Sequence, residues 1–382
     1  MFLPIYLDHN ATTALNPKVL EAMSPFMSMQ QGNATSRHTY GRIARDAIEQ
    51  AREQVALSVG AQTNQVIFTA SGTEANNLAI TGIASNMHDM EMIVSEIEHP
   101  CVTRPAEAMQ KRGWQLKKLA MNSLGNYDED HLAAILNKRT GLLSVMFANN
   151  ETGVLQNIAK LGEISRKHGA YMHSDAVQAL GKTPINFSEL NIEAMSISSH
   201  KIHGPQGAGA LILHKRVDIQ PILYGGGQER GLRSGSENVA AIVGFGKACE
   251  IATDQLSNYQ THTRQLREML EQGLTQLGAT IFGAQTHRLT NTSFFAFPNI
   301  EGETLVVALD KQGFAVASGS ACSSNSTEPS HVLLAMGVAP DLARGAIRVS
   351  LDLDNTPSQI SSLLMAIKTE LTRLRSLAAI AA

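Results

Sequence analysis

Strand-like and helix-like segments alternate along the first half of the chain, and this alternation constrains the fold more than any other feature. Short, largely apolar runs predict strands at residues 66–69, 92–94 and 142–148, and further strands are predicted at residues 115–119 and 171–175. Helical spacing of apolar residues separates them, at residues 74–84, 103–112, 128–137 and 158–168. Such alternation is typical of a mostly parallel sheet with helices on both faces, so the sequence predicts an α/β fold.

The pattern changes after Asn238. A single helical region is predicted over residues 238–277, and shorter mixed segments follow it to a last helix that begins at Pro357. A chain of 382 residues is also long for one core. We therefore expect a large domain over residues 15–255 and a smaller α+β domain formed by residues 1–14 and 256–382.

Composition excludes some classes of function. The formal charge of −3 leaves no basic surplus to neutralise phosphates, so we expect no direct nucleic-acid partner. No apolar run reaches membrane-spanning length, and the first ten residues lack the basic and apolar regions of a secretory signal. Three widely spaced cysteines do not form a disulfide framework. A cytoplasmic location is expected.

A lysine lies in a tight turn between two apolar runs. The stretch Ser198-Ser199-His200-Lys201 follows residues 195–197 and precedes residues 210–213. A lysine held between core strands loses hydration, which favours the uncharged, nucleophilic amine that Schiff-base chemistry needs. Most lysines are ordinary surface residues, and Lys201 alone does not distinguish a surface lysine from a Schiff-base lysine. The residues at the other strand ends must decide between these two interpretations.

Polar residues follow several of the other predicted strands. The turn at Gly72-Thr73 opens a helix and is a candidate anion site, although many such turns are plain helix caps. His99 follows one strand, and Asp175 and Gln178 follow another. Because ligands bind beyond the carboxyl ends of the strands in such sheets, we expect these side chains to lie close together.

These residues match the needs of an aldehyde-bearing pyridine phosphate. That cofactor needs a lysine for the imine, a carboxylate for its ring nitrogen and a donor for its phenolic oxygen. Lys201, Asp175 and Gln178 supply these groups, while His99 supplies a flat ring and the turn at residues 72–73 an anion cup. The sequence therefore predicts a pyridoxal 5′-phosphate enzyme without a metal ion.

The three cysteines differ in their surroundings. Cys249 lies on a predicted helix and has the pattern of a core residue. Cys101 follows His99 closely, but we expect the helix that begins at Pro100 to turn it away. Cys322 lies among small polar residues at 318–326, which predict an exposed, mobile loop in which a thiolate can form. We expect Cys322 to be the nucleophile.

At this level of detail the sequence resembles the cysteine desulfurases of the class V aminotransferase group, and most closely those of group I that feed iron–sulfur cluster assembly. The resemblance covers nearly the whole chain and rests on motifs in family order: Tyr6-Leu7-Asp8-His9-Asn10-Ala11-Thr12-Thr13, Ser71-Gly72-Thr73-Glu74-Ala75-Asn76-Asn77, Glu98-His99-Pro100, Asn149-Asn150-Glu151-Thr152-Gly153, Asp175-Ala176-Val177-Gln178, residues 198–205, Gly225-Gly226-Gly227-Gln228-Glu229, Arg233-Ser234-Gly235-Ser236-Glu237-Asn238, Ser318-Gly319-Ser320-Ala321-Cys322-Ser323 and Ile347-Arg348-Val349-Ser350.

The resemblance implies fold type I of the pyridoxal-phosphate transferases, with a mostly parallel seven-stranded sheet in the large domain. It implies that Lys201 binds the cofactor and acts as a base, and that His99 stacks on the ring and moves protons. It also implies cofactor contacts for a larger set of residues, namely Gly72, Thr73, Asn150, Asp175, Gln178, Ser198, His200 and, from the other subunit of a homodimer, Ser236. Asn150 and Arg348 would hold the substrate carboxylate.

The activity implied by the resemblance is conversion of L-cysteine to L-alanine with a persulfide formed on Cys322, which would also serve as a transient ligand of an iron–sulfur cluster. The sulfur acceptor would be an iron–sulfur scaffold, a tRNA-thiolation protein or a partner in DNA sulfur modification. Two alternatives remain open at this point. One is another cofactor enzyme, such as an aminotransferase, a β-lyase or a selenocysteine lyase, and the other is an inactive scaffold for sulfur-transfer partners.

Overall fold

The computed structural model describes residues 4–88, 90–319 and 328–381. Its larger sheet has seven strands, in the spatial order β2-β8-β7-β6-β5-β3-β4. Six strands run parallel, and β8 is antiparallel to both of its neighbours. The strands are β2 (Val66–Thr69), β3 (Glu91–Ser95), β4 (Gln115–Leu119), β5 (Thr140–Ser144), β6 (Tyr171–Asp175), β7 (Ala194–Ser198) and β8 (Gly209–Leu213). The prediction of a mostly parallel seven-stranded sheet is confirmed.

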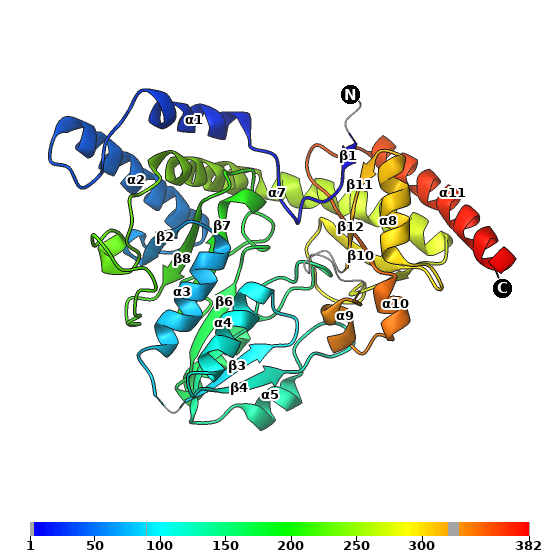
Figure 1. Cartoon of the computed structure of the whole chain (residues 1–382), viewed down its shortest axis with the longest axis horizontal. Helices are drawn as coiled ribbons and strands as arrows, with labels where there is room; N and C mark the ends of the chain where they lie inside the picture. The colour runs from blue at the N-terminus through cyan, green and yellow to red at the C-terminus, as the bar shows by residue number, and fades with distance from the viewer. Residues whose placement is uncertain (1–3, 89, 320–327, 382) are drawn as a thin grey trace.

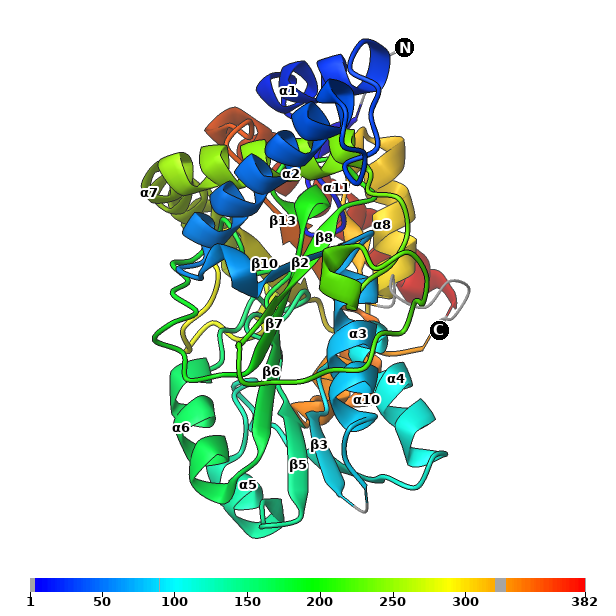
Figure 2. The same ribbon diagram turned by 90° about the vertical axis from the view of Figure 1, so that its left-hand side faces the viewer.

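Helices cover both faces of this sheet, as Figure 2 shows from its side. On one face, Ile67 and Leu211 pack with α3 (Gly72–Ala84) and α4 (Pro100–Gln110). On the other, Phe68 and Ile212 pack with α2 (Thr39–Ser58), α6 (Ile158–His168) and the first half of α7 (Val239–Gln276). Coverage on both sides explains why every residue of β2, β3, β5, β7 and β8 is buried. Helix α5 (Glu129–Ile135) follows β4.

One helix of this region is absent from the sequence prediction. Helix α1 (Pro17–Ser28) begins after Asn16, whose side chain accepts a hydrogen bond from the backbone N–H of Lys18. Only Val19 and Met23 of α1 are buried, and Pro25 lies inside it. So few buried positions leave no clear helical period in the sequence.

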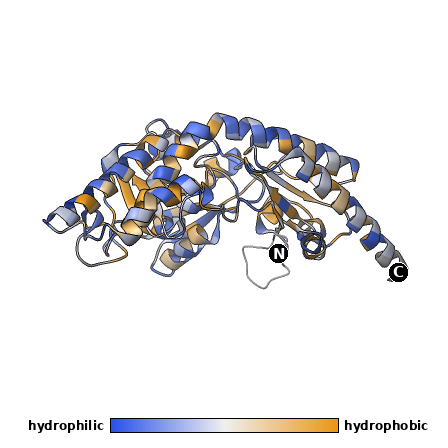
Figure 3. Ribbon diagram, turned by 90° about the horizontal axis from the view of Figure 1, so that it is seen from above, coloured by the Kyte–Doolittle hydropathy of each residue, from blue (hydrophilic) through white to orange (hydrophobic). Residues whose placement is uncertain are grey.

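A second, four-stranded antiparallel sheet has the order β12-β13-β10-β9. Its strands are β9 (Thr280–Ile281), β10 (Thr292–Ala296), β12 (Ala317–Ser318) and β13 (Ile347–Ser350). Helices α8 (Gly302–Lys311), α9 (His331–Ala335), α10 (Pro340–Arg344) and α11 (Pro357–Ala381) accompany it. In Figure 3 the strands are largely orange, whereas the helices alternate between blue and orange as amphipathic helices do.

Helix α7 joins the two sheets, and Figure 1 shows it running from one to the other. Ala241 and Phe245 in its first half belong to the core of the large sheet. Leu266 and Leu270 in its second half belong to the core of the small sheet. The proposed domain boundary at residue 255 falls inside this helix and stays a prediction.

The N-terminal segment reaches the large sheet from the small one. Strand β1 (Ile5–Tyr6) pairs in parallel with β11 (Phe314–Ala315). Beyond β1 the chain crosses to the turn after β7, where the N–H of Thr13 donates to the carbonyl of His200 over 3.0 Å. This crossing brings residues 10–13 to the carboxyl end of the large sheet. Within the described residues, no helix combines the length and apolar character needed to cross a bilayer.

Candidate active site

A pocket of about 270 Å³ lies at the carboxyl ends of β2, β6 and β7. Its lining comes from the turns after several strands of the sheet, where the topology brings distant segments together. The described residues that line it are Ser71, Gly72, Thr73, His99, Cys101, Met146, Ala148, Asn150, Asp175, Val177, Gln178, Ser198, His200 and Lys201. Nine of the residues to which the sequence assigned a cofactor, catalytic or substrate role therefore meet in one pocket.

One wall of the pocket is the N-terminus of α3. Ser71 caps the helix, and its hydroxyl accepts a hydrogen bond from the N–H of Glu74 over 3.1 Å. The first N–H groups of a helix have no acceptor within the helix and can bind an anion. A Cβ atom on Gly72 would lie 2.6 Å from Val177 Cγ2, so a glycine here lets the turn lie close to the segment that follows β6.

Two further residues of this wall come from the turn after β7. Within the part of the chain that the structure describes, the buried Ser198 hydroxyl has no hydrogen-bond partner, so it is a donor that a ligand could engage. Beside it, Nδ1 of His200 lies 3.2 Å from Thr12 Oγ1. Burial, reinforced by the charges of Lys201 and Lys182, lowers the pKa of His200 to about 4. The imidazole is therefore neutral at physiological pH and serves as a hydrogen-bonding group.

Asp175 ends β6 and faces the centre of the pocket. It is 6% exposed. Its Oδ2 accepts from Asn76 Nδ2 at 2.7 Å, and its Oδ1 accepts from the N–H of Val177 at 2.9 Å. Burial raises the pKa of this carboxyl group. Across the described ranges no lysine or arginine forms a salt bridge with it, so a cationic ligand group would stabilise the charged form.

His99 caps α4, and the cysteine that follows it folds back toward the pocket. Nδ1 of His99 accepts from the N–H of Cys101 at 3.2 Å and lies 2.9 Å from its Sγ. The prediction that the helix turns Cys101 away is wrong, because the capping contact keeps the first helical turn against the imidazole. Burial lowers the pKa of His99 and raises that of Cys101, so both are uncharged.

Lys201 reaches the pocket from the short 3-10 helix η2 (Ser199–Lys201). Its Nζ donates to the carbonyls of Asn10 and Ala11, each over 2.7 Å. The side chain of Gln178 donates to the same Asn10 carbonyl through Nε2 at 2.9 Å. The N-terminal segment thus supports the lysine and the glutamine together.

Two sequence-predicted residues lie outside the pocket lining, and a third is not among the described residues. Arg348, on β13, is 5% exposed and is absent from the pocket lining. Its guanidinium donates to Asp8 Oδ1 at 2.6 Å and to the carbonyl of Asn150 at 2.9 Å, so it lies behind Asn150. Ser236 is exposed between the 3-10 helix η3 (Glu229–Gly231) and α7, and it too is absent from the lining. Cys322 lies outside the described residues.

Sequence reasoning overlooked three polar residues that support the pocket. Asn76 holds Asp175, Asn10 accepts from Lys201 and Gln178, and Lys182 donates to Gln178. The available signal for Asn76 was its place one helical turn after Gly72, on the helix face that starts at the anion turn. Lys182 carried a weaker signal, since its partners become neighbours only through the fold.

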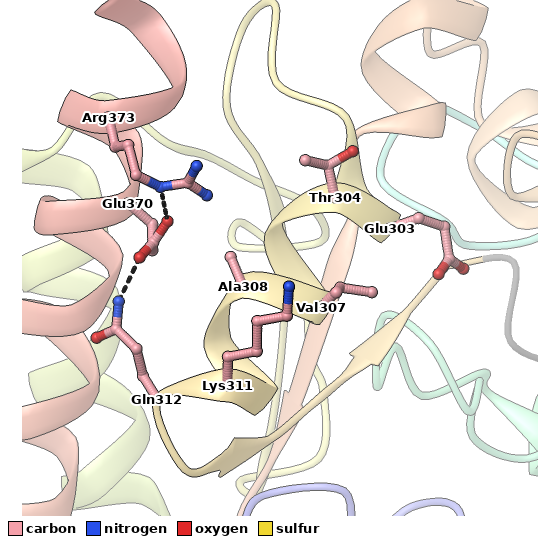
Figure 4. Close-up of a pocket in the computed structure, with 8 residues that line it drawn as sticks. All are labelled: Glu303, Thr304, Val307, Ala308, Lys311, Gln312, Glu370 and Arg373. Carbon is pink, nitrogen blue, oxygen red and sulfur yellow. Dashed lines mark hydrogen bonds and ion pairs between the residues drawn. The ribbon is translucent and has the colours of Figure 1, made fainter. Parts of the chain in front are cut away.

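A larger hollow of about 600 Å³ lies between α8 and α11, and Figure 4 shows its side chains. Glu370 forms an ion pair with Arg373 at 2.7 Å and accepts a hydrogen bond from Gln312. Glu370 thus pairs with Arg373 of its own helix and with Gln312 at the end of α8. None of the residues predicted to carry chemistry lines it, so the smaller pocket is the candidate active site. The larger hollow is lined by Glu303, Thr304, Val307, Ala308, Lys311, Gln312, Glu370 and Arg373.

Comparisons with known proteins identify the family of the chain. A model of the family described as aminotransferase class-V matches residues 5–363. The cysteine desulfurase IscS of Dictyoglomus turgidum is 40% identical over 377 residues, covering 98% of this chain and 96% of its own. A solved NifS-like protein superposes with a TM-score of 0.92 at 37% identity, covering 97% of this chain and 100% of its own. A structure of SspA in complex with cysteine gives a TM-score of 0.81 at 31% identity, with coverages of 91% and 98%.

Proposed function

The chain belongs to the class-V aminotransferase family, and from this premise we propose that it is a cysteine desulfurase that converts L-cysteine to L-alanine and carries the sulfur as a persulfide on Cys322. Relatives named cysteine desulfurase match it along 98% of its length. The structure of SspA with bound cysteine supports cysteine as the substrate. The observation that carries the proposal is the meeting of Lys201 with the buried carboxylate of Asp175 in one pocket.

The pocket fits pyridoxal 5′-phosphate. Lys201 would hold its aldehyde carbon covalently, and Asp175 would pair with its ring nitrogen. The helix N-terminus at Gly72 and Thr73, with the unpartnered Ser198 hydroxyl, would bind its phosphate. When bound, this cofactor stabilises negative charge on the substrate carbon that bears the amino group. His99 and Gln178 would contact its ring and its phenolic oxygen.

The chain's own residues would then bind the substrate and move its protons. Asn150 lines the pocket, and Arg348 lies directly behind it with an arginine fork suited to a carboxylate. The Arg348 guanidinium donates to the Asp8 carboxylate, and it would have to exchange this hydrogen bond for one to the substrate carboxylate. Lys201 lies at the end of η2 and lines the pocket, so we infer that it would remove the proton from the substrate Cα. The neutral His99 would accept or return a proton at its ring nitrogen.

Sulfur transfer requires a thiolate. Cys322 would attack the sulfur of the bound substrate, so that a sulfur–sulfur bond forms and the bond between sulfur and Cβ breaks. The electron pair of that bond stays on Cβ, which takes up a proton, and return of a proton to Cα then gives alanine. The two other cysteines are poor candidates, because burial raises the pKa of both Cys101 and Cys249 and holds them as thiols.

Alternatives within the family differ in their need for this thiol. An aminotransferase or a β-lyase would use the same lysine and aspartate without a nucleophilic cysteine. An inactive scaffold would have no reason to keep Lys201 and Asp175 converging on one pocket. The acceptor of the sulfur is proposed to be a scaffold or thiolation protein, since relatives that match the chain include IscS-named desulfurases.

The direct test is to incubate the purified protein with pyridoxal phosphate, a thiol reductant and L-cysteine, and to measure alanine and sulfide. We expect a yellow protein that forms alanine. Lys201→Ala should abolish alanine formation, whereas Lys160→Ala, which removes an exposed lysine paired with Glu129, should not. A colourless parent protein that takes up no cofactor would contradict the proposed function.

A further inference from the structure

Lys182 is a buried lysine for which the mechanism above has no use. It is 3% exposed and lies four residues after Gln178, behind the pocket lining. A lysine is costly to bury unless its amine is hydrogen-bonded. Its position next to a cofactor-contacting glutamine suggests what it does.

The amine of Lys182 has two amide oxygens as acceptors. Its Nζ donates to Gln178 Oε1 and to Asn10 Oδ1, each over 2.8 Å. A side-chain amide has two ends of nearly equal shape, one an acceptor and one a donor, and a lysine amine bonds only to the acceptor end. Lys182 therefore distinguishes the two ends of the Gln178 amide.

The consequence for Gln178 is a fixed donor on the side of the pocket. With Oε1 held by Lys182, Nε2 is directed to the N-terminal segment and is the end of the amide left to serve the pocket that Gln178 lines. One of its N–H groups donates to the carbonyl of Asn10 at 2.9 Å, which leaves the other for a ligand. The same carbonyl accepts from Lys201.

Asn10 is oriented in the same way. Its Oδ1 accepts from Lys182 and from Asn291 Nδ2, the latter at 3.0 Å. Its Nδ2 is thereby directed to Thr292 Oγ1 at 2.8 Å and to the carbonyl of Asn150 at 3.2 Å. Lys182 thus lies at the centre of a buried network that reaches the pocket through both amides.

The charge of the amine sharpens this role, because an ammonium has three N–H donors and no acceptor. Burial, with the nearby charges of Lys201 and Arg348, lowers the pKa of Lys182 to about 7, while Asp352 opposes that shift. Asp352 is itself paired with His203 at 2.8 Å and with His9 at 3.2 Å. A neutral amine keeps two N–H groups for the two amide oxygens, but its lone pair also accepts hydrogen bonds, so the ammonium distinguishes the amide ends more strictly.

We propose that Lys182 is a positioning residue that holds the Gln178 amide with Nε2 toward the pocket, as the hydrogen-bond donor to the phenolic oxygen of the bound cofactor. This inference rests on the proposed function. It goes beyond it because it assigns the orientation of Gln178 to a residue that does not touch the cofactor.

The test follows the visible absorption band of the bound cofactor against pH. In Lys182→Met the Gln178 amide is free to turn its oxygen toward the phenolic oxygen, which destabilises the negative charge there. We expect the midpoint of the band's pH titration to rise by on the order of one pH unit. In Lys182→Gln, which keeps a donor but no charge, the midpoint should lie closer to that of the parent protein than to that of Lys182→Met.

A double-mutant cycle separates action through Gln178 from a direct effect of the lysine. Gln178→Ala alone should raise the midpoint, and adding Lys182→Met to it should produce no further rise. The matched control is Ser165→Ala, which removes a buried hydrogen bond to the carbonyl of Leu161 within α6, outside the pocket lining, and should leave the midpoint unchanged. Thermal unfolding of the cofactor-free forms shows whether Lys182→Met and Ser165→Ala are equally well folded.

Two results would overturn the inference. One is an unchanged midpoint in Lys182→Met, and the other is an additive rise in the double variant. Either result with a yellow parent protein contradicts the role of Lys182 alone. A parent protein without the band contradicts the proposed function and this inference together.

Discussion

At the scale of single residues, burial decides which groups around the pocket are charged. Glu98 precedes His99 and is 1% exposed. Its Oε1 accepts from Ser95 Oγ and from the N–H of Met146, each over 2.6 Å, and its Oε2 has no hydrogen-bond partner among the described residues. Burial, with a smaller contribution from the charge of Asp175, raises the pKa of Glu98 to about 8. The group is therefore a neutral acid at physiological pH.

This protonation predicts a pH-dependent effect of Glu98→Gln on stability. The folded protein keeps a proton that the unfolded chain releases near the ordinary glutamate pKa of 4.5, so the parent loses stability as the pH rises from 4.5 through 8. Glutamine has no such proton. We expect the free energy of unfolding of the variant, relative to the parent, to increase by about 3 kcal/mol between pH 5 and pH 8. Chemical denaturation at both pH values measures it, and an equal difference at the two would refute the raised pKa.

The cysteines provide a second residue-scale prediction. Burial holds Cys101 and Cys249 as thiols, and alkylating reagents react with thiolates. In native protein at pH 8, iodoacetamide should therefore modify Cys322 and leave Cys101 and Cys249 unmodified. Peptide mass spectrometry identifies the labelled residues, and denatured protein, in which all three should react, is the control. Fast labelling of Cys101 in the folded protein would reopen its assignment as a nucleophile.

At the scale of elements, the register of the large sheet builds the anion side of the pocket. Gly209 begins β8 and is paired with Thr69 on one side and with Ser198 on the other. A Cβ atom at Gly209 would lie 2.5 Å from the carbonyl carbon of Ser71 and 2.9 Å from the N of Gly72. These are backbone atoms of the turn that would bind phosphate, so they have little freedom to move aside.

Gly209→Ala should therefore weaken cofactor binding as well as stability. We expect the dissociation constant for pyridoxal phosphate to rise by roughly tenfold, because the displaced turn no longer aims its N–H groups together. The matched control is Gly141→Ala in β5, where the added atom meets side chains of Met87, Met90 and Trp114 at 3.0–3.1 Å. The control should lose some stability and keep its affinity. Fluorescence titration with the cofactor distinguishes the two variants.

The elements predicted from sequence are those whose burial leaves a plain pattern. Strands over residues 115–119 and 171–175 and the helix over residues 158–168 coincide with β4, β6 and α6. Strands buried on both faces, such as β2, appear in a sequence as continuous apolar runs, whereas β4 is an edge strand with exposed residues and has no such run. The antiparallel direction of β8 left no such mark, because an apolar run has the same composition in either direction.

The site divides in the same way. Residues that directly follow a strand, such as Asp175 and Lys201, were predictable because topology places strand ends together. Partners such as Asn76 and Lys182 were not, because they lie behind the pocket and meet their partners only through the packing of α3 and the N-terminal segment. The direction of the Cys101 side chain was mispredicted for a similar reason, since it depends on the capping contact with His99.

At the scale of the whole molecule, two sheets share one long helix, and Ser236 stays outside the pocket of its own chain. Arg233 pairs with Glu74 at 2.7 Å and holds the loop before α7 near the start of α3, yet Ser236 on that loop is exposed and does not line the pocket. Large hydrophobic residues are also exposed, among them Tyr224 at 79% and Tyr40 at 56%. From these observations we propose a homodimer in which Ser236 would serve the partner's site.

Mixing two defective variants tests this arrangement. Lys201→Ala and Ser236→Ala should each form dimers with reduced activity, as light scattering and alanine formation would show. After random exchange of subunits, a mixed dimer contains one site with both Lys201 and Ser236, so activity should recover to about a quarter of the parent's. An active monomer, or mixed dimers without recovery, would contradict a role for Ser236 across the interface.

The central claim is that the sulfur of the cysteine substrate is transferred to Cys322. Measuring alanine formation by the Cys322→Ala variant tests it most directly. The variant should stay yellow, since the residues that fit the cofactor are unchanged, but its rate of alanine formation should fall by about a hundredfold or more. Cys249→Ala, which removes a buried thiol in the core, is the matched control and should form alanine at the parent rate. A Cys322→Ala protein that forms alanine from cysteine as fast as the parent would contradict the desulfurase mechanism.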